Sequence, residues 1–247
     1  MAGRLSALLA MGLLTLLTAP PARAQEPLVA DLSKHLVAIT TGFAGTDVLL
    51  FGAVDEPGDV VVVVRGPTRP EVVRHKERTA GIWVNTGQVT IDNAPTFYAV
   101  AATRPLATIA QSAVLDRHQI GFNHLDLRVA GDGAVVGEYR TALVRLKKRH
   151  GLYVDSMVPI NFLGQRLFRT EVHFPANVPV GTYSVEVYLF KDGEVVSAQT
   201  TPLMISKIGV GADVFDFAHQ RGAIYGIMAI FLAASAGWLA ATAFKKG

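Results

Sequence analysis

The 23 residues 222–244, which lie just before the C-terminal Lys-Lys-Gly, contain no charged side chain. A helix rises about 1.5 Å per residue, so this segment covers about 34 Å, enough to cross a hydrocarbon core of about 30 Å. Lys245 and Lys246 follow directly, and such cations favour the cytoplasmic side of a membrane. We therefore expect a transmembrane helix at 222–244 and a cytoplasmic tail at 245–247. The alternative is a core helix of a large soluble domain.

The N-terminus has the pattern of a secretory signal. Arg4 precedes the uncharged run 5–18, and Ala22-Arg23-Ala24 places small residues at the two positions that a signal peptidase recognises. This pattern predicts a signal peptide at 1–24, and an uncleaved anchor helix is the alternative. Together with the C-terminal span it predicts a single-pass protein of the inner membrane. Its N-terminal domain is then periplasmic and its C-terminus cytoplasmic.

The exported part is nearly neutral and has no cysteine. Of the 23 Lys and Arg residues, four lie in the signal or the tail, which leaves 19 against 20 Asp and Glu. This balance argues against a nucleic-acid or general polyanion binder. The absence of cysteine excludes disulfides, thiol redox chemistry and a lipid-modified N-terminal cysteine. The membrane attachment therefore rests on the C-terminal helix.

The exported part is expected to be mainly β. Short apolar runs rich in Val and Leu recur about every 8 to 12 residues, among them "HLVAIT", "TDVLLFGAV", "DVVVVVRG", "EVVRHKER", "GIWVN", "QVTIDN" and "TFYAVAAT". The clearest hairpin is "GTYSVEVYLFKDGEVVSAQTTPLMI", with Asp192-Gly193 at the turn. These features predict an immunoglobulin-like β-sandwich.

Two helices are expected to interrupt the strands. Residues 105–117 and 138–150 repeat apolar residues at helical spacing, and Gly151 suits a C-terminal cap. The predicted organisation is thus an N-terminal β-sandwich region at 25–103, a helical insertion at 104–150 and a C-terminal β region at 151–208. A linker at 209–221 then leads to the transmembrane helix at 222–244.

With this organisation, the chain resembles the uncharacterised predicted transmembrane proteins of alphaproteobacteria. The resemblance rests on "AITTGFAGTDVLLFGAV", "FYAVAATRPLATIA", "LFRTEVHFPANVPVGTYSVEVYLFKDGEVV" and "YGIMAIFLAASAGWLAATAFKKG". It implies a signal peptide, an exported β-rich domain and a single C-terminal span. It brings no catalytic or ligand residues, and it suggests a transporter of the sulfite-exporter type as a partner.

Chemical signatures are sparse. The segment "LDRHQIGFNHLDL" gathers His118, His124 and Asp126 near Asp116, which could form a Zn or Cu site. The histidines do not have helical ligand spacing, so a polar loop between a helix and a strand is the alternative. No G-x-S-x-G, P-loop or complete G-x-G-x-x-G occurs. No cofactor is therefore expected.

The second expected helix is strongly basic. It carries five cationic side chains, namely Arg140, Arg145, Lys147, Lys148 and Arg149. They could form a site for an anion, an acidic partner or lipid headgroups. Alternatively they form a solvated face, since cations near a helix C-terminus are favoured by the helix dipole.

The transmembrane segment has small residues four positions apart, at Ala229, Ala233, Gly237 and Ala241. They fall on nearly one face of a helix, and small faces let helices pack closely in lipid. The alternative is that Ala and Gly simply fill an anchor. A packing face would contact another membrane helix, either a transporter or a second copy.

Two hypotheses about function follow. The first is a non-enzymatic, membrane-anchored module that binds or stabilises another envelope protein such as a transporter. The second is a periplasmic metal-binding protein, or an enzyme without a known motif, that uses His118, His124 and Asp126. The lack of catalytic motifs and the presence of the tether favour the first.

The topology can be tested with reporter fusions. A reporter fused after Gly247 should be active only as a cytoplasmic reporter, and one fused near Gly211 only as an exported one. The physical reason is that the signal exports the chain and the uncharged segment stops transfer. The opposite pattern of activities would overturn the orientation.

Overall fold

The computed structural model describes residues 27–79, 81–129, 133–154, 158–209 and 217–244. The described residues are mainly β-strand, arranged as a four-stranded, a six-stranded and a three-stranded sheet. The mainly β character expected between the N-terminal segment and the C-terminal helix is thus confirmed. The expected signal peptide, 1–24, lies outside the described residues.

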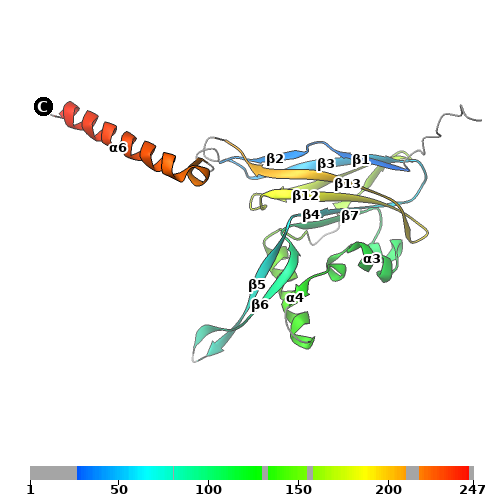
Figure 1. Cartoon of the computed structure of the whole chain (residues 1–247). Coiled ribbons are helices and arrows are strands. Elements are labelled where there is room, and N and C mark those ends of the chain that lie inside the picture. The colour runs from blue at the N-terminus through cyan, green and yellow to red at the C-terminus, as the bar shows by residue number, and fades with distance from the viewer. Residues whose placement is uncertain (1–26, 80, 130–132, 155–157, 210–216, 245–247) are drawn as a thin grey trace, which may run out of the picture.

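Two sheets pack face to face and form a sandwich (Figure 1). The first has the order β1-β3-β11-β10, with β1 at Leu28–Leu32, β3 at Gly45–Val54, β11 at Leu167–Pro175 and β10 at Asn161–Leu163. The second has the order β2-β13-β12-β4-β7-β9. Its strands are β2 Leu36–Ile39, β13 Glu194–Lys207, β12 Gly181–Lys191, β4 Asp59–Arg65, β7 Tyr98–Ala102 and β9 Val158–Pro159. Strands from both expected β regions, 25–103 and 151–208, stand side by side in each sheet.

The sandwich core comes from alternating residues of both sheets. Tyr183, Val185, Val187 and Leu189 of β12 point inward and are buried, as their alternation predicts. The β12–β13 turn has positive φ at Asp192 (52°) and Gly193 (86°), the conformation that an Asp-Gly hairpin turn requires.

The Tyr183 hydroxyl donates a hydrogen bond to the carbonyl of Pro179, four residues upstream, at 2.6 Å. This bond fixes the entry into β12, because the fully buried Tyr183 ring is packed in the sandwich core.

Strand β4 is buried on both faces. Val60, Val62 and Val64 pack in the sandwich core, whereas Val61 and Val63 face a second core on the other side of the sheet. An uninterrupted apolar run is the pattern expected of a strand that is covered twice. The run of five valines therefore requires a further layer over the six-stranded sheet.

That layer is formed by the segments inserted between the sandwich strands β4 and β7 and after β7. The first is the long hairpin of β5 Thr68–Thr79 and β6 Ile82–Pro95, which β8 Arg128–Val129 joins as a third strand. The others are α2 Leu106–Ile109, α3 Ser112–His118, the 3-10 turn η1 Phe122–His124 and α4 Gly133–Arg149. In Figure 1 the hairpin and the helices lie on the same side of the sandwich, next to β4 and β7.

Several expected elements differ in extent. The single helix expected at 105–117 is two short helices, because Ala110 between them adopts an extended conformation. The two strands expected at "GIWVN" and "QVTIDN" are one continuous strand, β6, which pairs with β5 along its length through register shifts. Helix α4 begins at Gly133, before the expected start at 138, and Gly151 after it has a φ of +69°.

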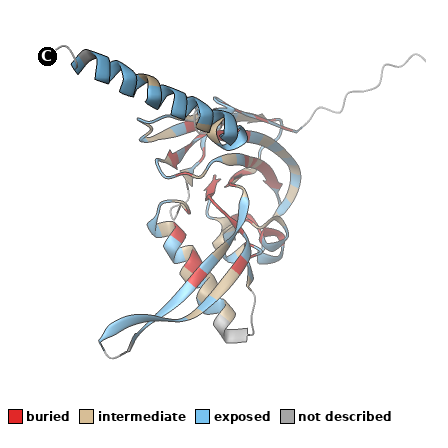
Figure 2. Ribbon diagram, turned by 60° about the vertical axis from the view of Figure 1, so that its left-hand side comes forward, coloured by how far each residue is buried: buried red, intermediate tan, exposed pale blue. Residues whose placement is uncertain are grey.

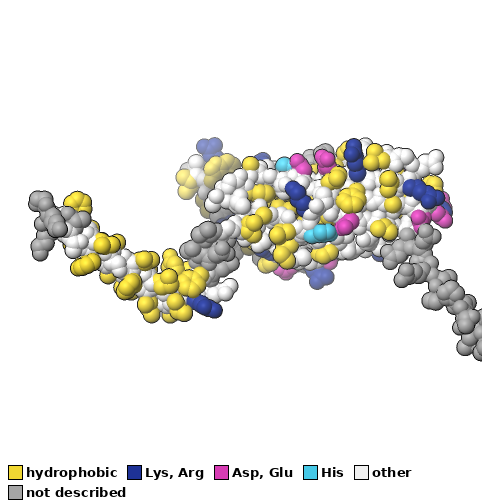
Figure 3. Space-filling view, turned by 90° about the horizontal axis from the view of Figure 1, so that it is seen from above, with side chains coloured by type: hydrophobic (Ala, Val, Ile, Leu, Met, Phe, Trp, Pro, Cys, Tyr) yellow, Lys and Arg dark blue, Asp and Glu magenta, His cyan; other side chains and the backbone are white. Residues whose placement is uncertain are grey.

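The C-terminal helix α6 spans Gly222–Phe244. The part of it that is long and apolar enough to cross a membrane, 222–242, has no buried residues. Figure 3 shows hydrophobic side chains around the helix, which extends away from the sandwich. Neither core includes a residue of α6, so the described fold does not use this helix for packing.

Because both cores lie within residues 28–205, residues 25–210 should fold without the span. We expect far-ultraviolet circular dichroism dominated by β-structure with a smaller helical part. A reducing agent should leave the melting temperature unchanged, since the chain has no cysteine. A mainly helical spectrum of the excised domain would contradict the fold.

Candidate functional site

A cleft of about 960 Å³ lies between α4, the η1 turn and the six-stranded sheet. Its volume is at the upper end of the range of about 300–1,000 Å³ found for ligand sites. Apolar side chains form part of its walls, and cationic, imidazole and uncharged polar groups also line it. The lining includes Val100, Leu106, Phe122, His124, Arg140, Val144, Arg145, Lys148 and Val154.

Tyr98 holds the η1 side of the cleft against the sheet. Its buried hydroxyl donates to the Gln119 carbonyl at 2.9 Å and accepts from the Gly121 amide at 2.7 Å. Burial raises the pKa of Tyr98 to about 12, so the hydroxyl stays protonated and can donate. Gly121 has a φ of +101°, a conformation that favours glycine at this turn.

Arg65 at the end of β4 connects the same turn to β12. Its guanidinium donates to the His118 carbonyl at 2.6 Å and to the Gln119 carbonyl at 3.1 Å, and it pairs with the Glu186 carboxylate. Both side chains of the ion pair are less than one-fifth exposed. The pair thus fixes the end of α3 on the outer face of the sheet.

Glu186 is the acceptor at the centre of this network. Its carboxylate also accepts from the Tyr188 hydroxyl at 2.5 Å and from the Ser184 hydroxyl at 3.0 Å. Burial alone would raise the pKa of Glu186, but the hydrogen bonds from Arg65 and Tyr188 outweigh it and hold the pKa below its usual value. Glu186 is therefore a charged, structural carboxylate at neutral pH.

Helix α4 forms the opposite wall and is fixed by its own cations. The Lys147 ammonium is buried and lies 2.5 Å from the Glu71 carboxylate of β5. Arg140 donates to the carbonyls of Asn123 and Leu125 beside the η1 turn. The expected solvated face therefore does not include all five cations of this helix, since Arg140 and Lys147 make structural contacts.

Phe122 supplies an aromatic surface inside the cleft. The Phe122 ring stacks on Tyr153 with the ring centroids 5.7 Å apart. The Lys148 ammonium lies 4.5 Å from the centroid of the Phe122 ring. A cation at this distance from an aromatic face is attracted by the ring quadrupole. The position of Lys148 in the cleft is therefore supported by a fixed ring.

The cleft is cationic. Arg140, Arg145 and Lys148 project from one helix, and Arg145 is exposed. The Asp116 carboxylate lies 2.6 Å from the imidazole of His124, which lines the cleft. The hydrogen bond between them lowers the pKa of Asp116. Three permanent positive charges beside apolar walls suit a ligand that has a carboxylate or another anionic group on an apolar body.

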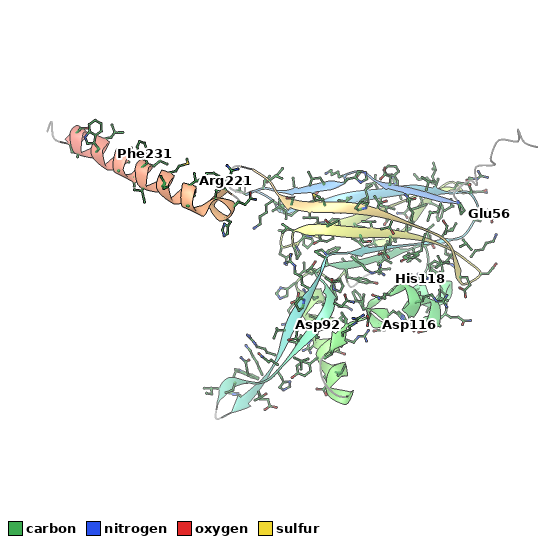
Figure 4. All side chains as sticks on the ribbon, viewed as in Figure 1. Glu56, Asp92, Asp116, His118, Arg221 and Phe231 are labelled. Carbon is green, nitrogen blue, oxygen red and sulfur yellow. The ribbon has the colours of Figure 1, made fainter. Side chains whose placement is uncertain are left out.

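The residues considered for a metal site lie in separate contacts. His124 pairs with Asp116, whereas Asp126 pairs with Arg128 at 3.2 Å. The His118 ring packs on Tyr188 with the centroids 5.2 Å apart. Figure 4 shows Asp116 and His118 on the α3 side of the molecule. Within the described parts of the chain, no group of three or more His, Asp or Glu side chains could hold a metal ion.

Sequence reasoning found the basic helix but missed what it faces. Phe122, Tyr98 and the Arg65–Glu186 pair had no local signal, because Arg65 and Glu186 are 121 positions apart. The sequence offered two hints: Arg65 ends the valine-rich strand β4, and Glu186 lies within the alternating strand β12. The residues of the small stripe, Ala229, Ala233, Gly237 and Ala241, are all exposed on α6.

Comparison with protein families gives one match. The family model described as "Putative transmembrane protein (Alph_Pro_TM)" matches residues 27–246, which include the sandwich, the inserted layer and α6. No curated protein matches the chain.

Replacing Glu186 with Gln should destabilise the protein by about 1–3 kcal/mol at about pH 7, because it leaves the largely buried Arg65 side chain without its counter-charge. The folded pKa of Glu186 lies below its ordinary value of 4.5, so its charge stabilises the fold above that pH and the stabilisation is lost on acidification. The difference between wild type and variant should therefore shrink at acidic pH. Urea unfolding followed by circular dichroism, at neutral and at acidic pH, measures the free energy of unfolding of the wild type and the variant.

The matched control is Glu194→Gln, at an exposed position at the start of β13. It should change the free energy of unfolding by less than about 0.5 kcal/mol. Equal effects of the two substitutions, or a Glu186→Gln effect that does not depend on pH, would contradict the role given to the Arg65–Glu186 pair.

Proposed function

Because the chain belongs to this family of transmembrane proteins, we propose that it is a single-pass protein of the inner membrane whose periplasmic domain binds another envelope protein. The apolar helix α6 supports the membrane attachment. Lys245 and Lys246 after the span support a cytoplasmic C-terminus, and the signal pattern at 1–24 supports export of the rest.

The observation that carries the binding role is the cationic cleft. Its two walls are held in place by buried contacts, namely Arg65 with Glu186 on one side and Lys147 with Glu71 on the other. A preformed site loses little conformational entropy when a ligand enters. The charges of Arg140, Arg145 and Lys148 favour an acidic segment of the partner.

We further propose that the sandwich is immunoglobulin-like. In support, the strand orders β1-β3-β11-β10 and β13-β12-β4-β7 correspond to the ABED and GFCC′ orders of such domains. The Tyr183 hydrogen bond to the Pro179 carbonyl corresponds to a tyrosine corner. Because a fold does not determine a function, this relation describes the scaffold, and the binding role rests on the cleft.

The transmembrane helix is the second contact that we propose for the partner. Ala229, Ala233, Gly237 and Ala241 leave a narrow face on which another helix can approach closely. The other helix belongs either to a transporter or to a second copy of this chain. A helix contact in the bilayer and an acidic segment in the cleft would together bind more tightly than either alone.

The cleft can be tested with two substitutions on one helix. Arg145 and Arg149 are both exposed on α4, but Arg145 lines the cleft and Arg149 does not. Arg145→Glu should weaken the complex that co-purifies from membranes by on the order of tenfold, about 1.4 kcal/mol. Arg149→Glu should leave it nearly unchanged. Equal recovery of cross-linked partners with both variants would contradict the binding role of the cleft.

The same measurement tests the membrane contact. Replacing Ala233 and Gly237 together with Leu keeps the helix in the membrane, because it becomes more hydrophobic. It should weaken the complex by about 1–3 kcal/mol through lost packing. If cross-linking is unchanged, α6 serves as an anchor alone.

A further inference from the structure

The outer half of the β5–β6 hairpin exposes large apolar side chains. Among residues 74–78 and 81–86 none is buried, and Ile82 and Trp83 are 65% and 69% exposed. Figure 2 shows buried residues at the root of the hairpin and exposed ones toward its tip. A two-stranded ribbon without a packed face is marginally stable in water. A surface that covers this half would therefore stabilise it.

The root of the hairpin is fixed. Val73, Ile91 and Ala94 are buried in the second core, and the Lys147–Glu71 pair joins β5 to α4. Gly87 lies so close to α4 that a Cβ added there would be 2.9 Å from the Tyr139 hydroxyl. The hairpin is thus a projection with a rigid base and an uncovered end.

The uncovered end is basic as well as apolar. Arg74, Lys76 and Arg78 lie on it with one carboxylate, Glu77, which gives a net charge of +2. Arg78 is directly opposite Trp83 in the strand register, so a cation and an indole share one face. Ile82 and Val84 occupy the other face. Aromatic and aliphatic side chains flanked by Lys and Arg are typical of segments that lie in a membrane interface.

The strand directions place this hairpin at the membrane end of the sandwich. Strands β4 and β13 are both antiparallel to β12, so they run in the same direction. The root of the hairpin follows the end of β4, and the tether to α6 follows the end of β13. Both therefore leave the sheet at the same end. In Figure 1 both lie toward the left of the view, the tip below the sandwich and the start of α6 beside its end.

The lengths agree with this placement. Strand β5 has 12 residues, which at about 3.3 Å each reach about 40 Å from the root. Residues 208–221 join β13 to α6, and a fully extended chain of that length covers at most about 50 Å. Residues 217–220 are helical and shorten that reach. The hairpin is thus long enough to reach the bilayer across the distance between sandwich and bilayer that the tether allows.

We propose that the end of the hairpin docks on the bilayer that holds α6. Trp83 and Ile82 enter the interfacial layer, and Arg74, Lys76 and Arg78 contact the headgroups of anionic lipids. The tether keeps the hairpin close to that surface, so a weak contact is sufficient because its effective concentration is high. This contact uses a different surface from the cleft and does not depend on the partner.

Fluorescence of Trp83 tests the contact directly. The chain has two tryptophans, Trp83 and Trp238, and Trp238 lies in α6. The full chain with Trp238→Phe, in nanodiscs of phosphatidylglycerol and phosphatidylcholine, leaves Trp83 as the reporter. We expect blue-shifted emission and quenching by lipids brominated near the headgroup. In nanodiscs of phosphatidylcholine alone the quenching should fall by about twofold or more.

Two charge variants make the test specific. Lys76→Glu with Arg78→Glu should remove most of the quenching in anionic nanodiscs. The matched control is Lys34→Glu with Arg166→Glu, which changes the net charge equally at exposed positions away from the hairpin. In the control variant, brominated lipids should quench the Trp83 fluorescence as much as in the parent protein.

Three results would overturn the proposal. The first is a solvent-like emission of Trp83 that brominated lipids do not quench. The second is equal quenching in the hairpin and control variants. The third is protection of Trp83 from acrylamide only when membrane extract is added to the nanodiscs, which would assign the tip to a protein partner.

Discussion

The arrangement of the β-rich domain depends on the burial of β4 on both of its faces. Val61 and Val63 would be exposed if the protein were a two-layer sandwich, and each fully buried Val contributes about 1.5–2 kcal/mol. The inserted hairpin and helices cover these side chains and are in turn held by them. The candidate cleft exists because this extra layer does not close completely over β7, where Val100 remains part of its lining.

Both surfaces that we connect with function come from the inserted layer. The sandwich supplies rigid attachment points, such as Tyr98 and Arg65, and the insertions supply the exposed cations and aromatic groups. This division is common, because loops and insertions can vary while the scaffold keeps its packing. It also explains why a nearly neutral domain has two locally basic surfaces, one on α4 and one on the hairpin.

The sequence predicted what local patterns determine and missed what tertiary contacts determine. The β12 alternation, the Asp192-Gly193 turn and the uncharged segment 222–244 are local signals, and the structure has each of them. The break at Ala110 and the continuous β6 were missed. Burial of Ala110 in the second core overrides the helical spacing, and the pairing of β6 with β5 continues between the two short apolar runs. The basic helix was identified, but its buried Lys147 and its aromatic neighbour Phe122 could be found only in three dimensions.

The cleft and the hairpin are mechanically connected, because α4 contacts both. Lys147 binds Glu71 of β5, while Arg145 and Lys148, two positions before it and one after, line the cleft. A hairpin that rests on the bilayer would hold the sandwich at a second point besides the tether. Two attachment points restrict the rotation of a domain more than one attachment point does. The orientation of the cleft toward a neighbouring membrane protein would then follow from the hairpin contact, and the lipid that surrounds the protein would influence how readily the partner binds.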